Sequence, residues 1–271
     1  MPSSNPAFRG FGAAGSGPQQ HAGWGQPQQQ YGAPAQYDPY AAPSPYAATT
    51  TRYLTMDDVV AKTGITFLVT VAAAAAVWAL PGSTGWGLAL PALVVGLVLG
   101  LVIAFKQIAN PAATLAYAVV EGILLGAISE AFNSFPQFEG IVMQAVIGTF
   151  GVFAGMLVVY KTGAIRVTPK LTRWVIGAMV GVLVLILANL VAGFFTAGGL
   201  GLRSGGPLAI IFSLVVIGVA AFSLLLDFDM ADEAIRRGAP AKFAWYIAFG
   251  LLVTVVWLYL EILRLLSYFR E

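Results

Sequence analysis

Five acidic residues lie inside, or at the edges of, long apolar stretches of this sequence, where ionised groups are expensive. Glu121 and Glu130 belong to one stretch, Asp227 and Asp229 close another, and Glu261 lies within the last one. A carboxylate in hydrocarbon must be neutral, hydrated or paired. Carboxylate oxygens are also the hard ligands that Ca²⁺ prefers. The set therefore favours a proton or cation pathway.

Most of these residues also have a purely structural interpretation. Glu261 and Arg264 are i,i+3 neighbours, so the two side chains can neutralise each other on one helix face. Asp227, Asp229 and Glu130 can lie at the water interface, where a carboxylate costs little. Both interpretations stay open at the level of sequence.

Glu121 is the hardest of the five to place at an interface. It lies roughly ten residues from either end of its apolar stretch, near the middle of a bilayer-length helix. We expect its carboxyl group to be protonated, or hydrogen-bonded to polar groups of neighbouring helices. It is therefore a candidate gating or ion-binding residue.

The elements that must position these residues are seven apolar stretches of membrane-spanning length. A hydrocarbon core of about 30 Å needs roughly 20 helical residues, and continuous apolar runs favour helices over barrel strands. The sequence therefore predicts an all-α polytopic membrane protein, a bundle of seven transmembrane helices in a lipid bilayer. The predicted spans are Val59–Leu80, Trp86–Phe105, Ala112–Phe132, Gly140–Tyr160, Trp174–Phe195, Pro207–Leu226 and Phe243–Tyr268.

Short motifs predict how these helices begin and where they meet. Thr55 and Asp58 have the spacing of a capping box at the start of the first helix. Pairs of glycines four residues apart let helix backbones approach closely in lipid. Such pairs occur at Gly96 and Gly100, Gly122 and Gly126, Gly151 and Gly155, and Gly177 and Gly181.

The composition changes at the start of the predicted bundle. Residues 1–52 are rich in Gln, Pro, Ala, Gly and Tyr, and they contain no apolar segment long enough for a signal peptide. Such a segment cannot bury enough surface to offset its ordering entropy. We expect a disordered cytoplasmic tail at 1–52, followed by a transmembrane domain at 53–271.

Composition also argues against several classes of function. The net charge of +2 gives no indication of a nucleic-acid partner. The chain has no cysteine, and its single histidine, His21, lies in the tail. Thiol catalysis, a serine–histidine pair and a histidine metal site therefore lack their residues. We expect neither an enzyme nor a bound cofactor.

The loops predict the orientation. With a cytoplasmic N-terminus, 11 basic residues face the cytoplasm and 3 face outward, a strong positive-inside bias. The cytoplasmic set is Arg9, Arg52, Lys62, Lys106, Lys161, Arg166, Lys170, Arg173, Arg236, Arg237 and Lys242, and the outer set is Arg203, Arg264 and Arg270. We expect a multi-pass protein of the cell inner (plasma) membrane with its N-terminus in the cytoplasm.

Three segments resemble the Bax inhibitor-1/YccA-like (transmembrane Bax inhibitor motif) family. EGILLGAIS at 121–129 resembles the EG-x-x-LG-x-IS segment of the family's third helix. LDFD at 226–229 is similar to the family's aspartate at the end of the sixth helix. LYLEILRLL at 258–266 resembles LYLD-x-x-x-L-x-x-LL, with Glu261 where the family has an aspartate. The tail and TMDDVVAKTG at 55–64 resemble bacterial members of the actinobacterial type.

The resemblance implies a pH-sensitive leak for cations, with Ca²⁺ as the expected ion. In such proteins a carboxylate pair from the sixth and seventh helices shares a proton and holds the pore closed. Here the resemblance assigns the pair to Glu261 and Asp229, with Asp227 as the competing partner. Deprotonation would make the pair repel and would offer Asp229 and Glu261 to Ca²⁺ as oxygen ligands.

Simple geometry puts a condition on this pair. A hairpin that turns at Gly238–Pro240 places Glu261 opposite the sixth helix near residue 217, far from Asp229. The pair therefore requires a tilt, a break or a half-span in the sixth helix. The alternative function is a non-conducting regulator that uses the tail at 1–52 to bind a membrane-bound protease or another membrane protein.

Overall fold

The computed structural model describes residues 52–80 and 84–270, and there the chain forms helices joined by short turns. Seven of these helices are long and apolar enough to cross a membrane, which confirms the predicted all-α polytopic bundle. The tail predicted at 1–52, His21 included, lies outside the described residues except for Arg52. The helices are α1 (Met56–Trp78), α2 (Thr84–Lys106), α3 (Pro111–Asn133), α4 (Ile141–Thr162), α5 (Pro169–Gly193), α6 (Pro207–Arg236) and α7 (Ala244–Tyr268), with short 3-10 turns η2 (Pro136–Phe138) and η3 (Ala241–Phe243).

Helix starts follow from side chains that satisfy free backbone N–H groups. The predicted capping box is confirmed, since Thr55 accepts a hydrogen bond from the Asp58 amide while the Asp58 carboxylate accepts one from the Thr55 amide. Asn110 and Thr168 cap α3 and α5, and each is followed by a proline in the first helical turn. These boundaries are set locally by the sequence.

The sixth helix is longer than predicted, because it continues past Leu226 to Arg236. The additional segment is polar, and it is stabilised by ion pairs between neighbouring turns. Arg236 pairs with Asp232 and Glu233, and Arg237 pairs with Glu233. The two aspartates that were expected to close this helix therefore lie inside it.

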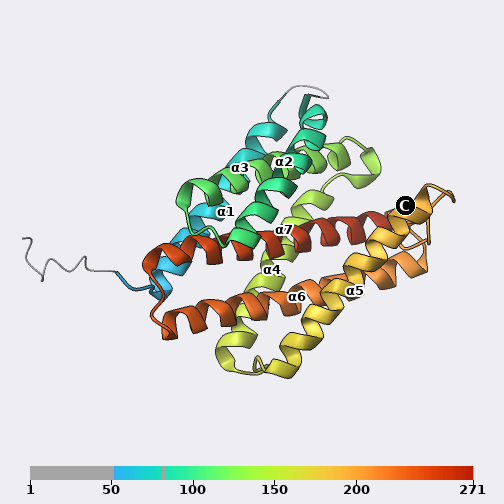
Figure 1. Cartoon of the computed structure of the whole chain (residues 1–271). Coiled ribbons are helices and arrows are strands. Elements are labelled where there is room, and N and C mark those ends of the chain that lie inside the picture. Colours follow the sequence, from blue (N-terminus) through green and yellow to red (C-terminus); the bar gives the residue numbers. More distant parts are fainter. Residues whose placement is uncertain (1–51, 81–83, 271) are drawn as a thin grey trace, which may run out of the picture. The chain divides into compact units, whose positions relative to one another are not determined.

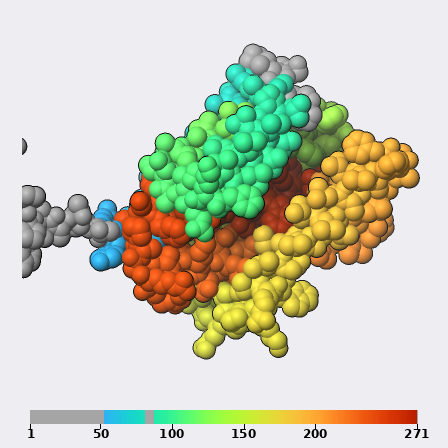
Figure 2. All heavy atoms as spheres, in the orientation of Figure 1, coloured from blue at the N-terminus to red at the C-terminus, as the bar shows by residue number. Residues whose placement is uncertain are grey.

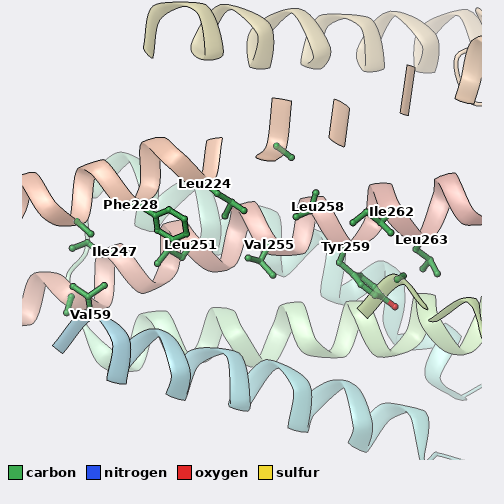
Figure 3. Packing of buried hydrophobic residues seen from close by; sticks show 14 of the residues in the cluster. Val59, Leu224, Phe228, Ile247, Leu251, Val255, Leu258, Tyr259, Ile262 and Leu263 are labelled. Carbon is green, nitrogen blue, oxygen red and sulfur yellow. The ribbon is translucent and has the colours of Figure 1, made fainter. Parts of the chain in front are cut away.

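α7 runs through the middle of the bundle. It packs against α1, α3, α4 and α6, whereas α2 packs mainly on α3 and α5 on α6. In Figure 1, α7 passes between α1, α2 and α3 on one side and α5 and α6 on the other. Figure 3 shows Leu224 and Phe228 of α6 beside Leu251 and Val255 of α7 in the main apolar core. Acidic groups on α7 therefore lie in the interior.

The periphery of the bundle leaves part of α7 visible. From the side drawn in Figure 2, dark red atoms of α7 lie between the green atoms of α2 and α3 and the yellow atoms of α5. Most side chains of α5 are exposed in the chain by itself, as expected of a helix that faces lipid. The lipid-facing helices thus surround a buried central one.

Two of the four glycine pairs are helix contacts. A Cβ atom on Gly122 would collide with the Thr70 carbonyl of α1, and one on Gly126 would lie 2.5 Å from the Ala74 carbonyl oxygen. Gly96 and Gly100 of α2 receive side chains of α3 in the same way. These contacts confirm that the pairs let helices approach closely.

The other two glycine pairs are not contacts within this chain. These pairs are Gly151 with Gly155 and Gly177 with Gly181. A Cβ atom added to any of these four glycines would meet nothing within 4 Å. The prediction was therefore wrong for α4 and α5. Spacing places two glycines on one face, but it does not say whether another helix covers that face.

The segment before α1 is attached to the turn between α6 and α7. The Leu54 amide donates to the Ala239 carbonyl, and the Ala241 amide donates to the Arg52 carbonyl, each at 2.8 Å. Lys62 adds a 2.8 Å bond from its ammonium to the Ala241 carbonyl. We call this the basic end of the bundle, because the basic turns after α2, α4 and α6 lie there. The other end is the opposite end.

Candidate functional site

Glu261 lies in the interior, between α7 and α6. Its side chain is 2% exposed. One carboxylate oxygen accepts a 2.9 Å hydrogen bond from the Ser213 hydroxyl of α6. The other oxygen lies 2.6 Å from Arg264 Nη1 on α7. The ion pair of Glu261 with its i,i+3 neighbour Arg264 is therefore present in the structure. The α6 residue opposite Glu261 is Ser213, one helical turn from the predicted residue 217.

A second basic residue lies near this ion pair. Arg203, in the loop before α6, is partly desolvated and is repelled by Arg264, and both effects lower the pKa of its guanidinium group. Attraction to Glu261 acts in the opposite direction. The opposite end of the α6–α7 contact therefore carries more positive than negative charge.

Asp227 makes the second acidic contact between α6 and α7. Its carboxylate accepts a 2.6 Å hydrogen bond from the Thr254 hydroxyl of α7. Gly250 leaves room for it, since a Cβ atom there would lie 3.9 Å from the other oxygen of Asp227. No cation forms an ion pair with Asp227 among the described residues. The carboxyl group is held by a neutral hydroxyl.

The two contacts are reciprocal. α6 contributes the hydroxyl of Ser213 and the acid of Asp227, while α7 contributes the hydroxyl of Thr254 and the acid of Glu261. We call these four residues the α6–α7 seam. Each contact gives a buried polar group a hydrogen-bond partner on the other helix. The seam therefore fastens the central helix to α6 at two depths.

The expected pairing of Glu261 with Asp229 is not formed in this structure. At 100° per helical residue, Asp229 points away from Asp227, and it lies beside Tyr160 of α4 instead. Roughly 20 Å of helix separate Ser213 from Asp227 at 1.5 Å per residue, so neither aspartate is near Glu261. The correction follows from α6 being one unbroken helix, without the tilt or break that the pair requires. Of the two candidates, Asp227 faces α7.

Glu121 lies between α3 and α2, at 8% exposure. Its polar neighbour is Tyr117, one turn earlier on the same helix. A Cβ atom on Gly96 would lie 3.2 Å from the Glu121 carboxylate, and one on Gly100 would lie 3.1 Å from the Tyr117 ring. The glycines of α2 therefore form the surface that covers Glu121.

Glu130 is the acidic residue with the least compensation. Its side chain is half-buried, and its Oε2 atom is buried without a hydrogen-bond partner among the described residues. The preceding residue, Ser129, shares a 2.7 Å hydrogen bond with Tyr259 between α3 and α7. A buried acceptor without a donor is rare in proteins. Glu130 thus stays a candidate of the second rank.

The sequence did not single out the hydroxyl partners of the acids. Ser213, Thr254 and Tyr117 each lie inside an apolar stretch, and only their chemistry could have drawn attention to them. Serine and threonine are common in membrane helices, where they can bond to their own backbone, so the type alone is a weak signal. The contact between α6 and α7 identifies Ser213 and Thr254 as partners, whereas Tyr117 and Glu121 are i,i+4 neighbours on one helix.

Two cavities lie between α1 and α4. The larger has a volume of about 820 Å³, opens at the basic end and includes Asp229, and the smaller has about 640 Å³ and is almost entirely apolar. Phe67 lines both of them. The residues of the α6–α7 seam line neither of these two cavities. The described part of the chain also has no cluster of three or more acidic residues that would hold a metal ion, and Asp229 and Glu261 stay separate candidates for Ca²⁺.

The comparison with known families agrees with these segments. A family model described as Bax inhibitor 1 like matches residues 5–271. A search among curated proteins gave no match. The family match includes all seven helices and every acidic residue discussed above. The chain therefore belongs to the Bax inhibitor 1 like family.

Proposed function

We propose that the bundle is a slow leak for cations, with Ca²⁺ as its ion, and that the α6–α7 seam is its gate. The observation that carries the proposal is the pair of acid–hydroxyl contacts across a buried helix interface. Acidic groups inside a membrane bundle are costly, and they mark ion or proton paths more often than structural sites. We also propose that the basic end faces the cytoplasm, in the cell inner membrane.

Asp227 is the pH-sensitive group of this gate. When it is protonated, the carboxyl group is neutral and its contact with Thr254 costs little in a buried interface. When it is ionised, the neutral Thr254 hydroxyl cannot balance the charge, so the state in which water reaches Asp227 gains population. Flux is therefore expected to rise as the pH rises through the titration of Asp227.

Glu261 has a different part in the gate. Its charge is balanced by Arg264 and by the Ser213 hydroxyl, so it does not need a proton to remain buried. Release of Glu261 towards an ion requires that the Ser213 contact breaks. When both contacts are open, the carboxylates of α6 and α7 supply hard oxygen ligands of the kind that Ca²⁺ takes.

The test is Ca²⁺ flux into liposomes that contain the purified full chain, measured across a pH series. Asp227→Asn cannot ionise, so it should flatten the pH dependence of the flux. Asp232→Asn, in an exposed ion pair with Arg236 on the same helix, is the matched control and should keep the profile. An absence of flux in the unaltered protein would exclude the leak.

A membrane regulator without conduction is the second candidate, and one contact favours it. The residues that follow the tail are bonded to the turn between α6 and α7, so a partner that binds the tail could act on the central helices. The partner would be a membrane-bound protease or another membrane protein. Deletion of residues 1–50 separates the two candidates, because a leak should survive it and a tail-dependent regulator should not.

A further inference from the structure

The larger cavity is amphipathic along its length. Its mouth lies at the basic end and is lined by charged residues of α4, α6 and the turn after α4, while its floor consists of apolar side chains of α1, α4, α6 and α7. The charged residues are Lys161, Arg166, Asp229, Asp232 and Arg236, and the floor includes Val59, Val60, Phe67, Phe153, Leu157 and Phe228. A fully water-soluble ligand would leave the floor unused.

The charges at the mouth are divided between its two sides. On the α6 side, Asp232 is bonded to Arg236, which also pairs with Glu233. On the α4 side, Lys161 and Arg166 are exposed and form no ion pair among the described residues. The α4 side therefore offers two uncompensated cations to an anion.

The depth of the cavity matches one leaflet of a bilayer. Phe67 is at the midpoint of α1, and its ring packs edge-on against Phe153 with centroids 5.8 Å apart. From Met56 to Phe67, α1 rises roughly 16 Å at 1.5 Å per residue. Half of a hydrocarbon core of about 30 Å is close to this length. The two rings thus close the cavity near the middle of the membrane.

We infer that this cavity binds an anionic phospholipid of the leaflet at the basic end, with its phosphate at Lys161 and Arg166 and an acyl chain that reaches Phe67. The two cations supply the charge that a phosphate requires, and the apolar floor supplies the surface for the chain. The inference does not depend on the proposed leak, because the residues of the α6–α7 seam do not line the cavity.

The first test measures lipid retention by native mass spectrometry of the detergent-solubilised full chain, with phosphatidylglycerol and phosphatidylcholine in competition. The unaltered protein should retain phosphatidylglycerol in preference. Each of Lys161→Gln and Arg166→Gln should reduce that preference about fivefold, the effect of one basic residue near an anionic surface. Lys170→Gln and Arg173→Gln remove the same charges outside the cavity and should leave it unchanged. If Lys170→Gln and Arg173→Gln lowered the preference for phosphatidylglycerol as much as the two cavity variants do, net charge alone would explain the preference. That result would overturn the proposed site.

The second test fills the cavity without changing charge. Gly64 lines it, and a Cβ atom there would meet nothing within 4 Å, so Gly64→Trp can place its ring inside. Gly177→Trp on α5, equally open, is the control. Only Gly64→Trp should displace the lipid. Glycerol phosphate alone should not bind to the protein. If it bound as tightly as the lipid, the mouth of the cavity would be a site for a soluble anion instead. Stabilisation by Ca²⁺ rather than by lipid would likewise overturn the inference.

Discussion

Glu261 and Arg264 lie one turn apart on α7 and form an ion pair of 2.6 Å, in which the Glu261 side chain is 2% exposed and that of Arg264 27%. The carboxylate is thus inside the bundle, and its partner reaches towards the opposite end. Such a geometry makes the two residues interdependent, because a buried charge without its partner is costly.

Removal of the arginine should therefore destabilise the protein in a pH-dependent way. Arg264→Gln leaves Glu261 buried and unpaired, and it should lower the free energy of unfolding by about 3–5 kcal/mol at pH 8. At low pH the loss should be smaller, because a protonated Glu261 needs no cation. Thermal unfolding in detergent at several pH values measures the difference.

The double variant Arg264→Gln/Glu261→Gln provides the check on that interpretation. It should regain much of the lost stability and lose the pH dependence, since no buried charge remains. Arg237→Gln, which breaks an exposed pair with Glu233, should cost little at any pH. If Arg264→Gln were no more harmful than Arg237→Gln, the buried ion pair would not matter to stability.

The seam hydroxyls should each contribute to the stability of the α6–α7 contact. Thr254→Val keeps the shape of the side chain but leaves the Asp227 carboxyl group without its donor, at a cost of about 1–3 kcal/mol. Thr162→Val is the control, since that hydroxyl is exposed and bonds only to its own helix. Unfolding of both variants in the same detergent compares them. Equal stabilities would mean that Asp227 finds water or another donor.

The glycine pairs allow the same Gly→Ala substitution to be compared at a covered position and at an open one. Gly122→Ala places a Cβ atom against the Thr70 carbonyl and should cost about 1–3 kcal/mol through overpacking. Gly151→Ala has open space at the same position and should be neutral or slightly stabilising, by up to about 1 kcal/mol. Thermal unfolding distinguishes the two outcomes. A tolerated Gly122→Ala would show that α1 can move away from α3 at little cost.

Lys62 should hold the segment before α1 against the turn between α6 and α7. Its ammonium group bonds to the Ala241 carbonyl and lies 6.0 Å from the Trp245 ring. Lys62→Met removes both contacts, so amide hydrogen exchange at Ala239 and Ala241 should become faster while the helix centres stay protected. Lys106→Met, at the exposed end of α2, should not change exchange in this turn. Unchanged exchange in Lys62→Met would mean that the backbone bonds suffice.

The orientation of the bundle can be tested by cysteine labelling, because the chain has no cysteine of its own. Positive-inside counting predicts that Lys170→Cys reacts from the cytoplasmic side and Ser204→Cys from the outside. Both positions are exposed. The measurement uses a reagent that does not cross the membrane, applied to intact cells and to permeabilised cells. Labelling of Lys170→Cys in intact cells would reverse the proposed topology.

The sequence by itself determined the elements of this protein. Seven apolar stretches predicted seven spans, because a bilayer demands roughly 20 helical residues for each crossing and this demand is local to each segment. The capping box at Thr55 and the ion pair of Glu261 with Arg264 were also predictable, since both join residues within one turn. The motifs at 121–129 and 258–266 indicated the family that the comparison confirmed.

Only the tertiary structure decided how these elements meet. From the sequence, both Asp227 and Asp229 could be the acidic residue of α6 that contacts α7. The rotation of α6 relative to α7 places Asp227 against Thr254. The same packing brought Ser213 to Glu261 and covered two glycine pairs while leaving two open. The physical reason is that the position of a residue in the sequence determines the face of the helix on which it lies. Which other helix covers that face depends on how all seven helices pack together.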